Sequence, residues 1–376
     1  MHIPLAWHHL FHNKVRTTVA VVGVTFPIVL VFVQLGLYGS CLIGATQLYD
    51  ALDFDLVLLA ADYVSLGGSG AFPRSRLAQA RAARGVQEVR PLYLGFQFWR
   101  NPDTASQREM LIIGCDPRGQ TFRLADVTTR LEALQRPDTA LIDRLTRPEF
   151  GPQHTGLITE VGGHRIAIVG QYMLGTGFLA DGDIIVSDVT FARLFPSLPV
   201  QQVSLGLVQL APGADLRMVI HALRQDLPND VRVLSRAELE AAERQYWVQS
   251  TSIGILFGWG VLVGFAVEIV IPYQILSTDV TNRFPEYATL KAMGYSHGAL
   301  ARMVLQHALL LGGGGYLSGL GVALGMYRLV AATTHLPIGM DPVRGVWVGG
   351  VTLGLCVGAG LLALRKVRAA DPAELF

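Results

Sequence analysis

The chain has 376 residues, of which 51% are hydrophobic and only 16% are charged, and its formal net charge is +1. Because average soluble domains carry about 25% charged residues, this composition excludes an ordinary soluble protein and favours residence in a membrane. The near-zero net charge points to neither a nucleic-acid partner nor an acidic tail.

Residues 1–16 predict a short amphipathic helix on the cytoplasmic face of the membrane. Apolar residues alternate there with His8, His9 and His12, and Trp7 can anchor at headgroup depth. The histidine spacing suits the wet face of such a helix better than a metal site.

Four later segments have the length and the low charge of transmembrane helices. They are residues 17–44, 249–278, 301–328 and 345–364. The apolar run of the first segment is far longer than the core of about 7–15 residues in a signal peptide, so we expect a retained anchor.

Basic residues are distributed unevenly around the four segments. They gather before the first segment, between the second and third, and after the fourth, at Lys14, Arg16, Arg283, Lys291, Arg302, Arg365, Lys366 and Arg368. By the positive-inside rule, both termini, the loop 279–300 and the tail 365–376 are cytoplasmic. Residues 45–248 and the short loop 329–344 are then expected outside.

The external segment 45–248 predicts a folded α+β domain. Strands are expected at 54–60, 89–99, 108–114, 165–169, 183–186, 202–210 and 231–234, and helices at 75–84 and 214–227. Two βαβ-like units flanking a β-rich insert predict a split ferredoxin-like subdomain. From Arg236 the pattern is helical into the second span without a breaker, which predicts a rigid helical stalk. Cys115 is the single cysteine of this segment, so no disulfide framework is expected.

Glycines recur at four-residue spacing in the last three spans. This pattern predicts close helix packing, either within the bundle or between two copies, although glycine is also common in membrane helices generally. The residues assigned to helix packing are Gly254, Gly258, Gly315, Gly319, Gly350, Gly354 and Gly358.

Glu268 is an intramembrane carboxylate within the otherwise uncharged second span. Such a group is costly in lipid, so it should face protein or water. A proton relay, a substrate contact and a hydrogen-bonded residue of the bundle all remain open, and His307 is a candidate partner.

Catalytic motifs are absent. The glycines 312–315 lead to Tyr316 and Leu317, without the lysine of a P-loop, and the sequence contains no HExxH, GxSxG or aspartate-rich calcium loop. We therefore expect a non-catalytic chain with no cofactor or metal of its own.

The polar loop between the second and third spans predicts a short helix with marked ends. Pro285 suits a first helical turn, Glu286 complements its positive end, Lys291 lies near its negative end and Gly294 can terminate it. Its expected position is cytoplasmic, between two membrane spans.

Sequence motifs in and around this loop, and elsewhere in the chain, resemble those of a known family. Residues 273–276 (YQIL), Asp279-Val280 and 285–295 (PEYATLKAMGY), together with 3–7, 55–57 and 147–151, resemble the DevC-type branch of the FtsX-like or MacB-like ABC transporter permeases. The similarity extends over the whole chain. Glu268 and Pro272 depart from the small or aliphatic residues usual in that family.

The resemblance implies a MacB-like (type VII) architecture in the bacterial inner membrane, and a homodimeric permease. It further implies a separate ABC ATPase dimer that holds ATP and magnesium, a periplasmic adaptor, a TolC-like outer-membrane channel and export of a glycolipid or other hydrophobic cargo. Motion of the ATPase would pass through the loop and spans to the external domain.

The expected contact with the ATPase is the loop itself. The residues assigned to this coupling are Arg283, Phe284, Pro285, Glu286, Tyr287, Leu290, Lys291 and Met293. Steps of three residues place Phe284, Tyr287 and Leu290 on one face. The alternative is that this face packs on the inner membrane surface.

Two other functions fit the same resemblance. One is an FtsX-like transducer that regulates a periplasmic cell-wall hydrolase, and the other is a lipoprotein-releasing permease. An ATPase and an adaptor that co-purify with the chain would favour export.

Overall fold

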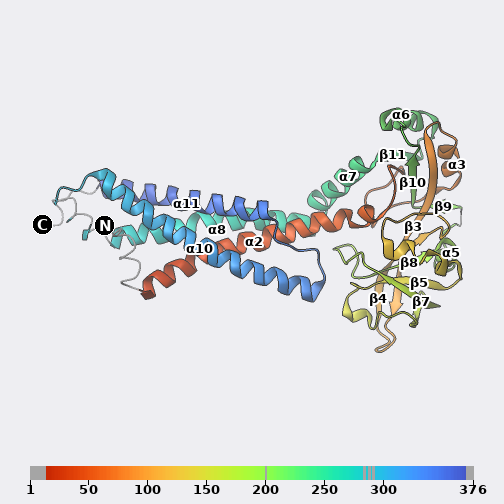
Figure 1. The fold of residues 1–376 in the computed structure, drawn as a ribbon, viewed down its shortest axis with the longest axis horizontal. Coiled ribbons are helices and arrows are strands. Elements are labelled where there is room, and N and C mark those ends of the chain that lie inside the picture. The colour runs from red at the N-terminus through yellow and green to blue at the C-terminus, as the bar shows by residue number, and fades with distance from the viewer. Residues whose placement is uncertain (1–13, 200, 283–284, 287–288, 290–292, 370–376) are drawn as a thin grey trace. The chain divides into compact units, whose positions relative to one another are not determined.

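The computed structural model describes residues 14–199, 201–282, 285–286, 289 and 293–369 (Figure 1). The chain divides into two compact units. A helical unit contains residues 1–39, 256–330 and 338–376, and an α/β unit contains residues 40–255 and 331–337. Most of the predicted amphipathic helix 1–16 and the end of the predicted tail 365–376 lie outside the described residues.

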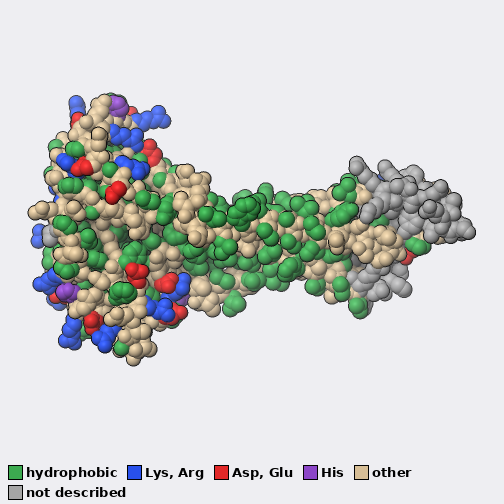
Figure 2. Space-filling model, turned by 180° about the vertical axis from the view of Figure 1, so that it is seen from behind, with side chains coloured by type: hydrophobic (Ala, Val, Ile, Leu, Met, Phe, Trp, Pro, Cys, Tyr) green, Lys and Arg blue, Asp and Glu red, His purple; other side chains and the backbone are tan. Residues whose placement is uncertain are grey.

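Four long helices supply the helical unit: α2 (Lys14–Ala51), α8 (Ser252–Asn282), α10 (His297–Thr334) and α11 (Pro342–Ala369). Each contains a stretch long and apolar enough to cross a membrane, at Thr17–Ala51, Ser252–Asn282, Gly298–Thr334 and Pro342–Leu362. Hydrophobic side chains cover the visible face of this unit (Figure 2). The predicted number and order of spans are confirmed.

Four antiparallel strands of the α/β unit form a ferredoxin-like sheet. Strands β1 (Leu56–Ala60), β3 (Val86–Arg100), β10 (Leu205–Leu210) and β11 (Val231–Ser235) lie in the order β11-β1-β10-β3. Helix α3 (Ser75–Arg81) precedes β3, and helix α6 (Leu216–Asp226) connects β10 to β11. Alternate residues of β1 enter two different core clusters, because successive side chains of a strand point to opposite faces. The split ferredoxin-like subdomain is confirmed.

The insert between β3 and β10 continues the same sheet and closes it. Strands β4 (Gln107–Cys115), β8 (Asp183–Ser187), β5 (Thr139–Asp143), β7 (His164–Tyr172) and β6 (Ile158–Val161) follow β3 in that spatial order. Strand β6 pairs back onto β3 through Trp99 and Val161, so these six strands form a closed barrel. Strand β2 (Phe72–Pro73), which precedes β3, pairs with β9 (Gln202–Val203) at the end of the insert. The short helices of the insert are α4 (Ala125–Thr128), η1 (Leu131–Gln135), η2 (Pro148–Phe150) and α5 (Asp188–Leu194).

Helix α7 (Arg236–Gln249) is the predicted stalk, but the prediction that it continues unbroken into the second span is wrong. It ends at Gln249, and α8 begins at Ser252. The Thr251 hydroxyl donates to the Trp247 carbonyl (2.6 Å) and accepts from the Gly254 amide (3.0 Å), so one side chain closes α7 and caps α8. A methyl group added at Gly254 would lie 1.8 Å from the Trp247 carbonyl oxygen, which leaves room for glycine alone.

Candidate coupling site

The segment between α8 and α10 contains helical residues that are followed by the predicted terminating glycine. Pro285 and Glu286 are helical and exposed. The Thr289 hydroxyl donates to the Pro285 carbonyl (2.9 Å), and the Met293 amide donates to the Thr289 carbonyl (3.0 Å). Gly294 follows with a φ of +92°, a left-handed conformation typical of a helix end.

Three of the eight predicted coupling residues can be placed on this turn. Pro285, Glu286 and Met293 are exposed, and Met293 retains 63% of its accessible surface. The other five, Arg283, Phe284, Tyr287, Leu290 and Lys291, lie outside the described residues. The turn therefore presents both an acidic and a large apolar side chain at the surface.

A close contact between a carboxylate and an imidazole joins α8 and α10 beside this segment. The Asp279 carboxylate lies 2.9 Å from Nε2 of His307, and both residues are only 8% exposed. Around them is a pocket of about 360 Å³ whose polar lining includes Thr17, Gln274 and Asn282. The sequence suggested His307 as a partner of Glu268, but its structural partner is Asp279. The pair fixes the helix end that enters the coupling segment to the helix that leaves it.

Glu268 lies in α8 and is completely buried. Its Oε1 accepts a hydrogen bond from the Thr352 hydroxyl of α11, while Oε2 has no hydrogen-bond partner within the part of the chain that the structure describes. The residue therefore faces protein. It joins two spans without a basic partner.

The predicted packing glycines fall into three groups. A methyl group added at Gly315 would come within 2.5 Å of Val24, and one at Gly319 within 2.8 Å of Ile28, so these two glycines permit α10 to approach α2. A second group meets no described atom within 4 Å of an added methyl group: Gly258, Gly350, Gly354 and Gly358. Gly254 lies at the break between α7 and α8 instead of between spans.

A buried polar network at the base of the α/β unit was not predicted. Glu243 of α7 is completely buried and accepts hydrogen bonds from Tyr63 and from Tyr49 at 3.3 Å. The two tyrosine hydroxyls lie 2.6 Å apart. Burial raises the pKa of Glu243, and these hydrogen bonds offset part of that rise. The network joins the end of α2, the loop after β1 and the stalk helix α7.

A second contact fastens α7 to the same place. The Arg236 guanidinium donates to the carbonyls of Tyr49 (2.8 Å), Leu52 (2.7 Å) and Phe54, and it lies 4.0 Å from the centroid of the Phe54 ring. One signal in the sequence could have revealed this buried face. Leu239, Glu243 and Trp247 recur every four residues and all three are buried, so Glu243 lies on the apolar side of α7.

These features define a four-span membrane protein whose large α/β domain is inserted between the first and second spans. Residues 258–372 match the family model described as the FtsX-like permease C-terminal domain. The matched region contains most of α8, the coupling segment, α10 and α11. This part of the chain is therefore similar to FtsX-like permease domains.

Solved structures with similarity to the chain include three transporter domains. The periplasmic region of MacB from Actinobacillus actinomycetemcomitans is 7% identical with a TM-score of 0.37, and the alignment covers 55% of this chain and 97% of that one. The extracellular domain of the noncanonic ABC-type transporter YknZ from Gram-positive bacteria is 12% identical with a TM-score of 0.33, covering 48% and 99%. A permease domain from Porphyromonas gingivalis is 16% identical with a TM-score of 0.35, covering 55% and 99%. No curated protein matches the chain.

Proposed function

We propose that this chain is the transmembrane permease subunit of an ABC exporter and that the turn around Pro285 and Glu286 receives force from a separate ATPase. The observation that carries this proposal is the position of an exposed helical turn between two spans, inside the region that matches the FtsX-like permease model. The sequence has no P-loop, so ATP and magnesium would be bound by the partner.

The contacts within each unit support a route for that force. In the helical unit, the Asp279–His307 pair makes α8 and α10 move together where they flank the turn. In the α/β unit, Glu243 and Arg236 fasten the stalk α7 to the end of α2. A displacement of α7 would therefore move the end of α2, and a displacement of the end of α2 would move α7. The α/β unit would then respond as a whole.

The remaining partners in the proposal follow the family resemblance. The chain would work as a homodimer, for which the uncovered glycines Gly350, Gly354 and Gly358 offer a closely packing face. The α/β unit would be periplasmic, with both termini cytoplasmic. It would meet an adaptor linked to a TolC-like outer-membrane channel, and the cargo would be a glycolipid or another hydrophobic molecule.

The test is a double substitution in the turn, Glu286→Arg with Tyr287→Ala, compared with Glu132→Arg. Glu132 is an exposed glutamate of the α/β unit, so the control has the same charge change far from the turn in sequence. We expect the wild-type chain and the control to co-purify with an ABC ATPase in mild detergent. The double variant should remain folded and dimeric while ATP hydrolysis is uncoupled from transport. Unchanged coupling in the double variant would remove the turn from the proposal.

A further inference from the structure

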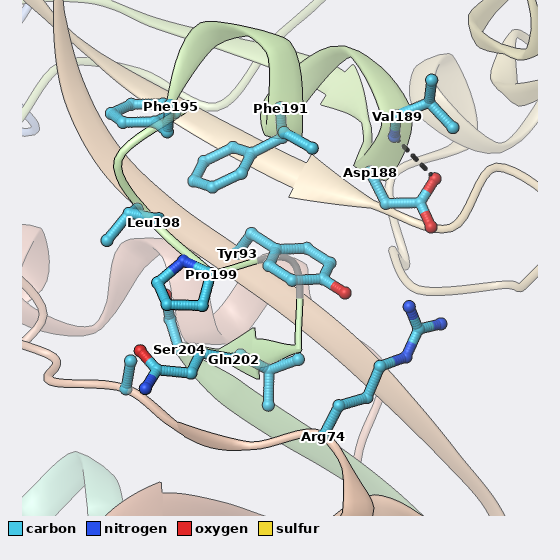
Figure 3. Close-up of a pocket in the computed structure, with 13 residues that line it drawn as sticks. Arg74, Tyr93, Asp188, Val189, Phe191, Phe195, Leu198, Pro199, Gln202 and Ser204 are labelled. Carbon is cyan, nitrogen blue, oxygen red and sulfur yellow. Dashed lines mark hydrogen bonds between the residues drawn. The ribbon is translucent and has the colours of Figure 1, made fainter.

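The α/β unit contains a second pocket, which the proposed function does not use. Its volume is about 360 Å³, and it lies among β3, α5 and the β2–β9 pair (Figure 3). Small-molecule sites are concave, mostly apolar hollows of roughly 300–1,000 Å³ with a few polar groups that fix orientation. The pocket therefore has the size of a site for a small ligand.

One end of the pocket is apolar. The rings of Phe191 and Phe195 stack with centroids 4.4 Å apart, and the Tyr93 ring lies 5.4 Å from Phe191. Leu198 and Pro199 complete the same side in Figure 3. The rings and aliphatic groups on this side offer a surface for an alkyl chain, and Gln202 and Ser204 also line the pocket.

The other end is polar and contains the hydroxyl of a largely buried tyrosine. Tyr93 is 8% exposed, and its hydroxyl makes no hydrogen bond within the described residues. In Figure 3 this hydroxyl points away from the apolar side, toward Arg74 and Asp188. Burial raises the pKa of Tyr93, so at neutral pH the hydroxyl is an uncharged donor.

Two charged side chains line this end, the basic Arg74 and the acidic Asp188. The Asp188 carboxylate accepts a hydrogen bond from the Val189 amide (2.9 Å). The Arg74 guanidinium is exposed and makes no side-chain hydrogen bond or ion pair with any residue that the structure describes. An acidic group placed here would meet a free guanidinium and a free phenol hydroxyl together, and charge-assisted hydrogen bonds of this kind are strong.

We propose that this pocket binds a single-chain amphiphile with an acidic head, of the class of medium-chain fatty acids. Arg74 pairs with the head, Tyr93 donates a hydrogen bond to it, and Phe191, Phe195 and Leu198 contact the alkyl chain. A peptide would need an open strand edge or a long groove, whereas this hollow is short and has one polar end. The proposal stands on the pocket alone and does not depend on export driven by an ATPase.

The test uses the full chain in lipid nanodiscs and a dodecanoic acid that carries a photoreactive diazirine. We expect saturable labelling of peptides from the segment between Asp188 and Ser204, mapped by mass spectrometry. Dodecanoate should compete at least about tenfold better than dodecanol, because the alcohol cannot pair with a guanidinium.

Matched arginine variants distinguish a specific contact of Arg74 with the acidic head group from a general effect of positive charge on the surface. Arg74→Gln should weaken labelling about tenfold, whereas Arg84→Gln should leave it unchanged. Arg84 is also exposed and partnerless among the described residues, but it does not line the pocket. Tyr93→Phe removes only the hydroxyl and should weaken labelling roughly threefold. Leu198→Trp should block the pocket, and circular dichroism verifies that each variant is folded.

Several outcomes would overturn the proposal. These are labelling confined to the spans, equal effects of Arg74→Gln and Arg84→Gln, and undiminished labelling of a folded Leu198→Trp variant. Loss of a co-purifying protein from Leu198→Trp, with labelling retained, would assign the pocket to a protein contact instead. None of these outcomes involves the coupling turn, so they leave the proposed function untouched.

Discussion

Glu243 in the α/β unit and Glu268 in the helical unit are both completely buried, yet the two regions hold them differently. Glu243 accepts hydrogen bonds from two tyrosines, contributed by separate elements. Glu268 accepts one hydrogen bond, from Thr352 on a neighbouring helix. In each residue Oε2 has no partner among the described residues.

The two buried glutamates should differ in their contribution to stability, because broken contacts of the α/β unit are replaced by water and broken contacts between spans are replaced within lipid. Groups of the α/β unit exchange their hydrogen bonds with water on unfolding, and a buried group that has lost its partner incurs the full cost of desolvation. Separated helices in lipid still find polar partners, so a hydrogen bond between spans contributes less than its geometry suggests. Although Glu243 and Glu268 are equally buried, Glu243 should thus contribute more to stability than Glu268.

The largest effect expected is that of Glu243→Ala. The Tyr49 and Tyr63 hydroxyls can then bond only to each other, so one buried donor is left without an acceptor. We expect the α/β unit to lose about 3 kcal/mol of unfolding free energy. Native-state hydrogen exchange measured by mass spectrometry reports this value for the strands of the unit separately from the helices.

The matched control is Glu240→Ala on the same helix. Glu240 makes partly exposed ion pairs with Arg236 (4.0 Å) and Arg244 (3.4 Å). Such pairs are worth about 0–1 kcal/mol, so its loss should be small. Equal effects of the two substitutions would show that the tyrosine network does not stabilise the unit.

Removing the hydrogen bond to Glu268 should have a smaller effect on stability than the loss of Glu243. Thr352→Val keeps the side-chain shape but removes the donor, and it should destabilise the helical unit by about 1 kcal/mol, because hydrogen bonds between spans are weak. Combining it with Glu268→Leu removes both polar partners and should return stability close to the wild-type value. Thermal unfolding of the helices in nanodiscs measures both.

A Thr18→Val substitution serves as the control for the valine change itself. Thr18 is exposed near the start of α2, and its hydroxyl makes no hydrogen bond that the structure records among the described residues. A cost above about 3 kcal/mol for Thr352→Val would contradict the comparison, because it would exceed the range found for hydrogen bonds between spans.

The two glutamates also show what sequence can reveal. Glu268 is conspicuous because it interrupts an uncharged run, whereas Glu243 lies among Glu238, Glu240 and Arg244 and is distinguished only by its place on the face of Leu239 and Trp247. The break between α7 and α8 was missed for a related reason. A single threonine side chain ends one helix and caps the next, without proline or a glycine run.

Long-range pairing sets a further limit. The two halves of the ferredoxin-like sheet were predicted because alternation and turn residues are local signals. The pairing of Trp99 with Val161 that closes the barrel has no local signal, and neither has the Asp279–His307 pair. The pocket beside Tyr93 likewise gathers Arg74 and Phe191 from distant segments. These three features depend on which distant segments the fold brings together, so the residue types in the sequence do not reveal them.

The last effect expected is a dependence on pH that belongs to the α/β unit. Because burial raises the pKa of Glu243, the folded unit holds its proton more tightly than the unfolded chain does. The resulting stabilisation is fully present below the unfolded pKa, near about 4.3, and is lost as the pH rises through the folded pKa. One such group contributes a slope of at most about 1.4 kcal/mol per pH unit.

Glu243→Gln isolates this contribution, since the amide does not titrate. Burial also raises the pKa of Asp183, but that carboxyl is present in both proteins and cancels from their difference. Hydrogen exchange measured between pH 4 and 7, corrected for the intrinsic exchange rate, should therefore show the wild-type protein losing stability relative to the variant as the pH rises. Parallel profiles would mean that Glu243 keeps the same proton affinity folded and unfolded. Any difference between the stability contributions of Glu243 and Glu268 would then come from the number of hydrogen bonds that each accepts. It would not come from the cost of burying a charged carboxylate.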